Sequence, residues 1–365
     1  MPLHCSNVFL ENDWLALFRM TPARFHKITS RYASLRIGVV GDFCLDRYLE
    51  IDSGKKEKSI ETGLPVYNVV NVRSQPGGAG TIVNNLAALG VGKISVVGFC
   101  GEDGEGYELQ KALGKVPHVS IEHFFATPGR RTFTYTKPLI LQRGEAPHEL
   151  NRLDLKNWTP TPVEIRQKLA RAVRALASMV DAIVVLDQTD IAGTGVVNPE
   201  VLTALQAAGR RHPKLFILTD SRRGLRDFPP FAFKVNRSEM AASVGSKDNL
   251  NLARIKTAAG ALARKNGQPI FVTLAEQGLL AASPSGQIEH VPALPVRGEI
   301  DIVGAGDAVT ANLTASLSSG AGLREALEIA RAAASVVIHK LGTTGTANVR
   351  EVKKLVTHSA DVSKI

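Results

Sequence analysis

From residue 161 onward, helix-like and strand-like segments alternate along the sequence, and this alternation limits the fold more than any other feature. Helix-like segments begin near residues 161, 198 and 249, and short apolar runs rich in β-branched residues lie at residues 182–186, 215–218 and 270–274. Helices that alternate with buried strands form right-handed crossover units, which place the strands parallel in one sheet with helices on both faces. We therefore expect an α/β fold with a central, mostly parallel sheet.

Two of these helix starts carry specific capping signals. Asn198 stands before a proline, and Thr161 stands before a proline with Glu164 three residues further on. The arrangement at Thr161 predicts a capping box with proline at the first helical position, and Asn198 predicts a single side-chain cap.

The first half of the sequence contains two β-rich stretches, at about residues 47–75 and 117–155, that lack a helical period. Between them, a Gly-rich turn at residues 76–80 opens an apolar helical segment that ends at Gly90. We expect the two stretches to form a small separate sheet, which cannot bury both of its faces by itself. This sheet is therefore expected to act as a lid over a ligand and to pack against the lid of a second subunit, giving a homodimer.

A second Gly-rich turn, at residues 301–307 (D-I-V-G-A-G-D), precedes an apolar helical segment that ends at Gly320. Gly304 and Gly306 let the chain turn sharply and expose consecutive amide N–H groups, and the positive end of the following helix adds to this anion cradle. Asp307 has two interpretations: it caps the helix, or it acts as a general base beside a bound phosphate. The spacing alone leaves both open, because a short glycine motif is weak evidence.

The charge of the chain is positive but not concentrated. The net charge of +10 comes from 44 Lys and Arg against 34 Asp and Glu, and these residues are scattered. With aromatic residues at 5%, this pattern argues against a nucleic-acid partner and is explained as well by anionic small substrates. No apolar stretch approaches the roughly 20 residues needed to span a bilayer, so no membrane contact is expected. Three widely spaced cysteines (Cys5, Cys44 and Cys100) indicate a reduced, cytoplasmic protein.

The N-terminal stretch differs from the rest of the chain. Residues 1–19 show no period and carry no motif, so we expect a flexible N-terminal extension. Met20 is then a candidate for the natural start. Residues 20–365 are expected to form one domain that includes the two lid stretches.

Five segments resemble, in order, the signatures of the ribokinase-like (PfkB) carbohydrate kinases. They are residues 41–46 (G-D-F-C-L-D), 76–80 (P-G-G-A-G), 236–239 (N-R-S-E), 273–278 (T-L-A-E-Q-G) and 301–307 (D-I-V-G-A-G-D). Ile302 replaces the usual threonine, Ala275 replaces the first glycine of its turn, and Thr81 and Ile82 stand where an asparagine is common. Separated matches that agree in order are stronger evidence than any single motif.

The resemblance implies a ribokinase-like fold and transfer of a phosphoryl group from ATP to a sugar hydroxyl, with Mg²⁺ as cofactor and activation by a monovalent cation left open. It implies Asp307 as the catalytic base, with an anion hole at Gly304, Ala305 and Gly306. The implied binding residues are Asp46, Gly77, Gly78 and Arg152 for the sugar, and Asn236, Glu239, Thr273 and Gly278 for ATP. Asn236 and Glu239 would organise Mg²⁺ through phosphates and water, which suits an ion that retains water ligands.

Within the family, the chain most resembles the heptose-phosphate kinases of lipopolysaccharide-precursor synthesis. Residues 41–48 (G-D-F-C-L-D-R-Y) and 151–154 (N-R-L-D) carry this resemblance, whereas residues 186–190 and 220–222 depart from it. The implied acceptor is a sugar or sugar phosphate, with heptose 7-phosphate as the specific candidate. A phosphorylated sugar needs a second anion site, for which the lid supplies Arg130, Arg131, Lys137, Arg143 and Arg152. The alternative is that they are solvated charges on edge strands.

Two other functions remain open from the sequence. One is a ribokinase- or fructokinase-like kinase of an unphosphorylated sugar. The other is a sugar- or nucleotide-binding relative without catalysis, which the departures at Ile302 and Thr81 favour and the presence of Asp307 disfavours. A nucleic-acid binder would instead show strongly salt-dependent binding to polyanions.

Overall fold

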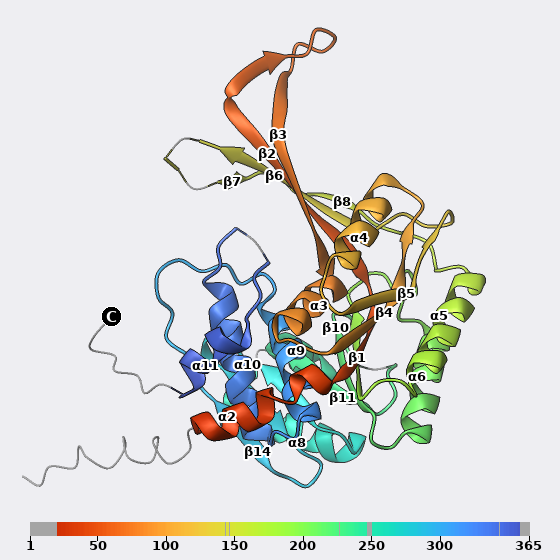
Figure 1. Ribbon diagram of the computed structural model, residues 1–365, viewed down its shortest axis with the longest axis vertical. Helices are drawn as coiled ribbons and strands as arrows, with labels where there is room; N and C mark the ends of the chain where they lie inside the picture. The colour runs from red at the N-terminus through yellow and green to blue at the C-terminus, as the bar shows by residue number, and fades with distance from the viewer. Residues whose placement is uncertain are drawn as a thin grey trace, which may run out of the picture.

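A computed structural model describes residues 20–142, 144–145, 147–225, 227–246, 250–342 and 344–357. Two features singled out from the sequence, the N-terminal extension at residues 1–19 and the lid cation Arg143, lie outside the described residues. The described chain forms a body in which helices cover both faces of a large sheet, and a long β-hairpin projects from that body (Figure 1).

The large sheet confirms the predicted α/β architecture. Its strand order is β14-β13-β12-β11-β10-β9-β1-β4-β5; the neighbours from β12 to β5 pair in parallel, and β12, β13 and β14 pair antiparallel. The strands are β1 (Arg36–Gly41), β4 (Lys93–Gly101), β5 (Val119–Thr127), β9 (Ala182–Asp187), β10 (Phe216–Ser221), β11 (Ala232–Asn236), β12 (Ile270–Thr273), β13 (Leu279–Ala282) and β14 (Ile288–Val291). Strands such as β9 are buried along their whole length, as a parallel sheet covered on both faces requires.

The helices divide between the two faces of this sheet. They are α2 (Pro22–Thr29), α3 (Ala79–Ala88), α4 (Gly104–Gly114), α5 (Val163–Leu176), α6 (Pro199–Arg211), α7 (Arg237–Ser243), α8 (Leu252–Asn266), α9 (Ala305–Ser318), α10 (Leu323–Ile338) and α11 (Val349–Thr357). Successive side chains of a strand point to opposite faces, so Val39 and Val40 of β1 enter different cores. Val40 packs with residues of α5, α6, α7 and α8, and Val39 packs with residues of α2, α3, α4, α9, α10 and α11.

The small sheet forms the lid and the projecting hairpin. It contains β2 (Phe43–Lys58), β3 (Pro65–Gly78), β6 (Thr134–Leu141), β7 (His148–Glu149) and β8 (Leu153–Leu155), in the order β3-β2-β6-β7 with β8 beside β6. The outer half of the β2–β3 hairpin extends away from the body (Figure 1). The prediction that residues 117–155 all belong to this sheet is wrong for β5, which pairs with β4 at the edge of the large sheet. Strand-like composition identifies a strand but not the sheet that it joins.

The two capping predictions have different outcomes. Asn198 caps α6 by accepting the amide of Val201 at 3.0 Å, as predicted. The capping box predicted at Thr161 is wrong, because Pro162 is the N-cap of α5 and the Thr161 hydroxyl donates to the carbonyl of Gly195 at 2.8 Å. Thr161 therefore ties the start of α5 to the loop that follows β9.

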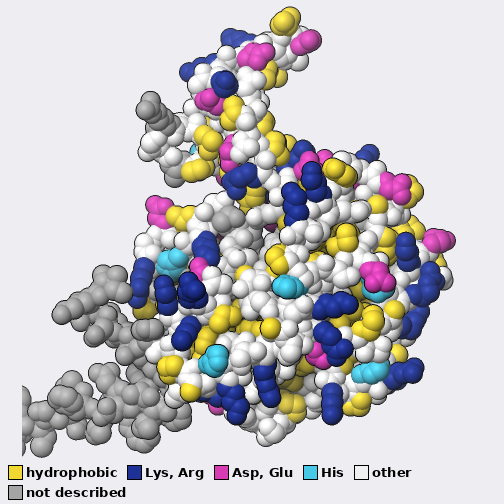
Figure 2. Space-filling view, in the orientation of Figure 1, with side chains coloured by type: hydrophobic (Ala, Val, Ile, Leu, Met, Phe, Trp, Pro, Cys, Tyr) yellow, Lys and Arg dark blue, Asp and Glu magenta, His cyan; other side chains and the backbone are white. Residues whose placement is uncertain are grey.

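The surface agrees with the scattered charge of the sequence. Lys and Arg side chains occur in several small groups over the visible face and do not form one continuous stripe (Figure 2). Among the described helices, none is both long enough and apolar enough to cross a membrane.

Candidate active site

The carboxyl ends of the parallel strands bring polar side chains from distant parts of the chain to one edge of the large sheet. Asp42 follows β1, Asp187 ends β9, Asp220 lies near the end of β10, and Asn236 ends β11. The start of α9 lies at the same edge, since the charge of Asp220 acts on Asp307. In open α/β sheets, ligands bind in the crevice outside this edge.

Asp46, Gly77 and Gly78 meet where the lid joins the body. A Cβ atom on Gly77 would lie 2.6 Å from the Asp46 carboxylate, so glycine is required for this carboxylate to pack against β3. Gly78 has a φ of 58° at the junction of β3 and α3, a conformation that other residues rarely adopt. Burial raises the pKa of Asp46, and the charges of Lys137 and Arg152 oppose that increase. The structure therefore brings the three residues together beside two lid cations.

The start of α9 has the free amides that an anion cradle needs. Gly304 is the N-cap with a φ of 81°, and no side chain caps the helix. The Ala308 amide donates to the carbonyl of Gly304 at 2.9 Å, and among the described residues the preceding amides of Gly306 and Asp307 have no acceptor. The Ala305 amide, which the sequence assigned to the anion hole, donates to the carbonyl of Ile302 at 3.2 Å, so Ala305 does not supply a free amide. Asp307 is the third helical residue and makes no capping bond, so the helix-cap interpretation does not hold.

The Asp307 carboxyl is unusually basic for its type. Burial, followed by the charge of Asp220, raises the pKa of Asp307 to about 7, against the opposing charges of Lys234 and Arg222. Asp46 adds a smaller increase, which shows that the acidic residues of the lid side and of α9 lie within electrostatic reach of each other. A carboxyl with a pKa near 7 can accept and release a proton at neutral pH.

A buried ion pair lies close to Asp307. Lys234 and Asp220 are neighbours in the register of β11 and β10, with Nζ and Oδ2 2.7 Å apart, and each residue is 7% exposed. The sequence analysis missed this pair. A signal existed, because a lysine between Phe233 and Val235 interrupts an otherwise apolar buried strand.

Asn236 and Glu239 form a reciprocal capping box at the start of α7. The Asn236 side chain accepts the Glu239 amide at 2.8 Å, and the Glu239 carboxylate accepts the Asn236 amide at 2.7 Å. Burial raises the pKa of Glu239, and its bond to Asn236 opposes this increase. No group of three or more His, Cys, Asp or Glu side chains that could hold a metal occurs in the described part of the chain. This donor set fits Mg²⁺ held through phosphates and water and does not fit a metal cage made of protein ligands alone.

Thr273 and Gly278 lie near this capping box. Thr273 pairs with Asn236 in the register of β12 and β11. Gly278 has a φ of 89°, and a Cβ atom there would collide with the carbonyl oxygen of Val291. Ala275 has a φ of 50°, in the left-handed region that costs L-residues about 1–2 kcal/mol, which is the physical reason for a glycine at this point of the signature.

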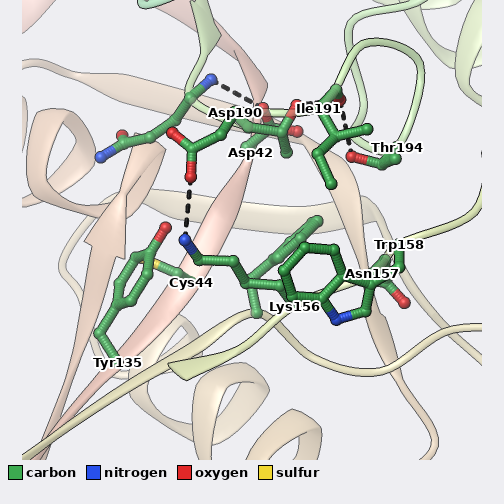
Figure 3. A pocket seen from close by; sticks show the side chains of 12 residues that line it. Asp42, Cys44, Tyr135, Lys156, Asn157, Trp158, Asp190, Ile191 and Thr194 are labelled. Carbon is green, nitrogen blue, oxygen red and sulfur yellow. Dashed lines mark hydrogen bonds and ion pairs between the residues drawn. The ribbon is translucent and has the colours of Figure 1, made fainter. Parts of the chain in front are cut away.

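A cavity of about 50 Å³ lies between the lid and the loop after β9 (Figure 3). Its lining includes Cys44 of β2, two residues before Asp46, so the cavity lies close to the place where Asp46, Gly77 and Gly78 meet. In Figure 3 the Lys156 side chain points to Asp190, and the two form an ion pair of 2.9 Å. Trp158, which is 73% exposed, forms another part of the wall.

Asp42 holds the loop side of this cavity in place. Its carboxylate accepts the amides of Gln188, Thr189 and Val196 at 2.8, 3.2 and 2.7 Å. Burial, followed by the charge of Asp187, raises the pKa of Asp42 to about 6, and the three amide bonds oppose this increase. The role of Asp42 could not be read from the sequence, because these partners lie more than 140 positions away along the chain.

Two of the lid arginines have different surroundings. Arg130 is 6% exposed and donates to the carbonyl of Thr194 at 2.8 Å, so it supports the fold and is not a free phosphate ligand. Arg152 pairs with Asp154 at 2.6 Å and lies over the ring of Tyr135, with its guanidinium carbon 4.6 Å from the ring centre. Of these two, Arg152 alone also acts on Asp46.

Comparison with known sequences identifies one family. A model described as pfkB family carbohydrate kinase matches residues 39–349. The Bifunctional protein HldE of Azorhizobium caulinodans is 31% identical over 308 residues, which cover 84% of this chain and 61% of that protein. The protein of the same name from Pelobacter propionicus is 30% identical over 93% of this chain and 67% of its own length. The chain thus spans 61% to 67% of the length of these two curated relatives.

Solved structures with the same fold are more distant in sequence. Arabidopsis thaliana ribokinase complexed with ribose and ATP has a TM-score of 0.64 and 19% identity, over 89% of this chain and 99% of that one. Escherichia coli phosphofructokinase-2 in complex with fructose-6-phosphate has a TM-score of 0.63 and 18% identity, over 88% and 98%. These likenesses show the fold, which is ribokinase-like.

The raised pKa of Asp307 predicts a pH-dependent cost to stability. The pKa of Asp307 in the folded chain, about 7, exceeds the ordinary value of 3.8. The folded chain is therefore most stable with this carboxyl protonated, and this contribution to stability is lost as the pH rises from about 4 through 7. Asp307→Asn stays neutral, and its advantage in free energy of unfolding over the unmodified chain should be larger at pH 8 than at pH 5 by about 2.6 kcal/mol. Urea denaturation at the two pH values measures this difference.

The matched control is Asp181→Asn. Its bonds to Arg36 hold the pKa of Asp181 below the usual range, so this substitution should lower stability at pH 8. An equal effect of Asp307→Asn at both pH values would contradict the raised pKa.

Proposed function

The chain belongs to the pfkB family of carbohydrate kinases, and from this premise we propose that it transfers the γ-phosphoryl group of ATP to a hydroxyl of a sugar phosphate, with Asp307 as the base. The observation that carries the assignment is the state of this carboxylate. Within the described residues it accepts no hydrogen bond, its pKa is about 7, and it stands beside the free amides at the start of α9. A structural carboxylate at this place would be expected to have partners.

The proposed step needs a base on one side of the transferred group and an anion site on the other. Asp307 accepts the proton of the acceptor hydroxyl, whose oxygen forms the new bond to the γ-phosphorus. The bond from that phosphorus to the bridging oxygen of ATP breaks, and ADP leaves. The amides of Gly306 and Asp307, at the positive end of α9, stabilise the charge on the transferred phosphoryl oxygens.

The nucleotide side of the site is assigned to Asn236, Glu239, Thr273 and Gly278. Mg²⁺ would be held near Asn236 and Glu239 through the phosphates and water, and when bound it neutralises charge on the β- and γ-phosphates. Glu239 would keep its bond to the Asn236 amide while its remaining lone pairs accept from metal-bound water. A monovalent cation is proposed as a further activator.

Replacing the base should slow turnover without weakening nucleotide binding. General base catalysis contributes roughly 10²–10⁴-fold, so Asp307→Asn should lower kcat by about that factor. The affinity for ADP, measured by calorimetry, should change little, because Asn keeps the shape of the side chain. Asp181 precedes the amino end of β9, whereas the site lies at the carboxyl end of that strand. Asp181→Asn is therefore the control and should keep full turnover. Near-complete turnover in Asp307→Asn would show that another group is the base.

The proposed acceptor is a sugar that already carries a phosphate, with heptose 7-phosphate as the specific candidate. The resemblance of residues 41–48 and 151–154 to the heptose-phosphate kinases supports it, as do the curated relatives at about 30% identity. Lys137 and Arg152 support it physically, because their charges already act on the sugar-side Asp46. A ribokinase- or fructokinase-like kinase of an unphosphorylated sugar is the alternative.

A phosphate on the acceptor sugar should raise kcat/KM. A charge-assisted hydrogen bond contributes about 1.5–3 kcal/mol, so kcat/KM for heptose 7-phosphate should exceed that for the free heptose by at least about tenfold. Arg152→Gln should raise KM for the phosphorylated acceptor and leave KM for ATP unchanged, whereas Arg36→Gln at the far end of β1 should change neither. Equal kcat/KM for the free and phosphorylated sugars would refute this acceptor and favour the alternative.

The projecting hairpin supports a homodimer formed through the lid. Val69 and Val72 of β3 are 43% and 45% exposed. They stand opposite Ile51 and Leu49 in the register, so they share one face of the hairpin. A small sheet with an exposed apolar face is expected to be covered by another surface, and the proposal assigns that surface to the lid of a second chain. The proposal includes no nucleic-acid or membrane partner.

Mutation of this face tests the dimer. Light scattering at micromolar concentration should give the mass of two chains, and Val69→Asp combined with Val72→Asp should give the mass of one. Glu57→Lys, opposite Val66 and therefore on the other face of the hairpin, should leave the dimer intact. A single-chain mass for the unmodified protein would rule the dimer out.

The proposed location is the cytoplasm. Cys44 and Cys100 are both buried and free, which agrees with a reducing compartment where ATP is available.

A further inference from the structure

Neither the fold nor the proposed role of Asp307 explains the chemical surroundings of Lys234. It belongs to β11, whose neighbours Phe233 and Val235 are buried in an apolar core. Successive strand residues face opposite sides of the sheet, so the Lys234 side chain lies on the other face, and its ammonium reaches the start of α9 at the carboxyl edge. There a Cβ atom on Gly306 would lie only 3.2 Å from Lys234 Nζ, so the ammonium rests against the backbone of the anion cradle.

The partners of this ammonium leave part of its capacity unused. An ammonium has three N–H donors, and within the described residues one of them reaches an acceptor, Asp220 Oδ2, at 2.7 Å. The same Asp220 oxygen also accepts from the Thr310 hydroxyl of α9 at 3.3 Å. The pair is thus fixed between the sheet and the first turns of α9, against Gly306 and Thr310.

Stability alone does not explain a buried lysine here. Taking an ammonium and a carboxylate out of water costs several kcal/mol per ion, and apolar residues in place of such pairs are often equally stable or more so. Ala232, on the same face of β11 as Lys234, and its register partner Leu218 show that apolar side chains are accommodated on this side of the sheet. What the lysine adds is a fixed positive charge against the cradle and near Asp307.

We propose that Lys234 is a positioning residue for phosphoryl transfer: through Gly306 it stabilises negative charge in the cradle, and through its charge it keeps Asp307 ionised near neutral pH. This inference rests on the proposed kinase function and deepens it. Preorganised positive charge where the transferred phosphoryl group gathers negative charge lowers the barrier, because little reorganisation is needed during the step.

The charges around Asp307 predict in which direction its pKa changes when one of them is removed. The groups that act on Asp307 from the surrounding elements are Asp220 of β10, Lys234 of β11, Arg222 after β10, Asp46 of β2 and the Cys44 thiol of β2. Lys234 itself also senses Glu239 of α7. Loss of the Lys234 charge should raise the pKa of Asp307, and loss of the Asp220 charge should lower it.

The test compares pH profiles of Lys234→Met with those of the unmodified enzyme. The acid limb of kcat/KM should move to higher pH by about one pH unit, as expected when a nearby opposite charge is removed. At saturating substrates kcat should fall at least about tenfold, less than the roughly 10²–10³-fold that follows loss of a donor in direct contact. Lys93→Met, on an exposed lysine at the other end of β4, is the control. An unchanged kcat and an unchanged acid limb in folded Lys234→Met would overturn the inference.

A double variant separates this role from simple neutralisation of Asp220. Lys234→Met with Asp220→Asn removes both buried charges, and it should fold even if the single variant is destabilised by its unpaired carboxylate. If Lys234 acts on the cradle, kcat stays low in the double variant. Recovery of the unmodified kcat would show that Lys234 only balances Asp220, and would overturn the inference.

A readout without turnover separates this inference from the kinase proposal. Carboxyl ¹³C NMR of Asp307, assigned with Asp307→Asn, should show a higher pKa in Lys234→Met than in the unmodified chain. An unchanged Asp307 titration would refute the electrostatic role of Lys234 whatever the turnover. Absence of acceptor-dependent ADP release in the unmodified chain would instead refute the kinase proposal, while the titration still decides the role of Lys234.

Discussion

Burial of several carboxylates at one edge of the large sheet is the constraint on which the site depends. Like charges in a low-dielectric region are unfavourable, so each carboxylate requires a partner or a raised pKa. Asp42 accepts three backbone amides, Asp187 accepts from an arginine and a serine, and Asp220 is paired with Lys234. Asp307 has no such partner within the described residues and titrates near pH 7. In the described part of the chain the first three carboxylates have partners and Asp307 has none, which is the reason for proposing Asp307 as the base.

The fold was largely predictable because it follows from local periodicity. Alternating helix and strand signals required parallel strands covered on both faces, and the Asn198 cap could be recognised from two adjacent residues. The errors arose where a distant partner decided the outcome. The Thr161 hydroxyl bonds to Gly195 instead of capping α5, and β5 joins β4 instead of the lid. A local pattern carries no information about either partner.

The candidate site shows the same division. The glycine turns indicated tight backbone positions, which the structure has at Gly77 and Gly304. Glycine is needed where a side chain would clash or where φ is positive. Lys234 was missed, since its proposed role depends on its approach to the backbone of Gly306, more than 70 positions away, although a lysine in an apolar strand was visible. Asp42 was missed for a similar reason. Residues that act through long-range contacts become interpretable only when those contacts are known.

The central claim is that Asp307 and the cradle at the start of α9 move a phosphoryl group from ATP to an acceptor hydroxyl. A ³¹P NMR time course with ATP, Mg²⁺ and heptose 7-phosphate tests it most directly. The account predicts that ADP and a new sugar-bound phosphoryl resonance appear in equal amounts, and that both depend on the acceptor. ADP with inorganic phosphate alone, or ATP left unchanged with every sugar and sugar phosphate supplied, would contradict the account.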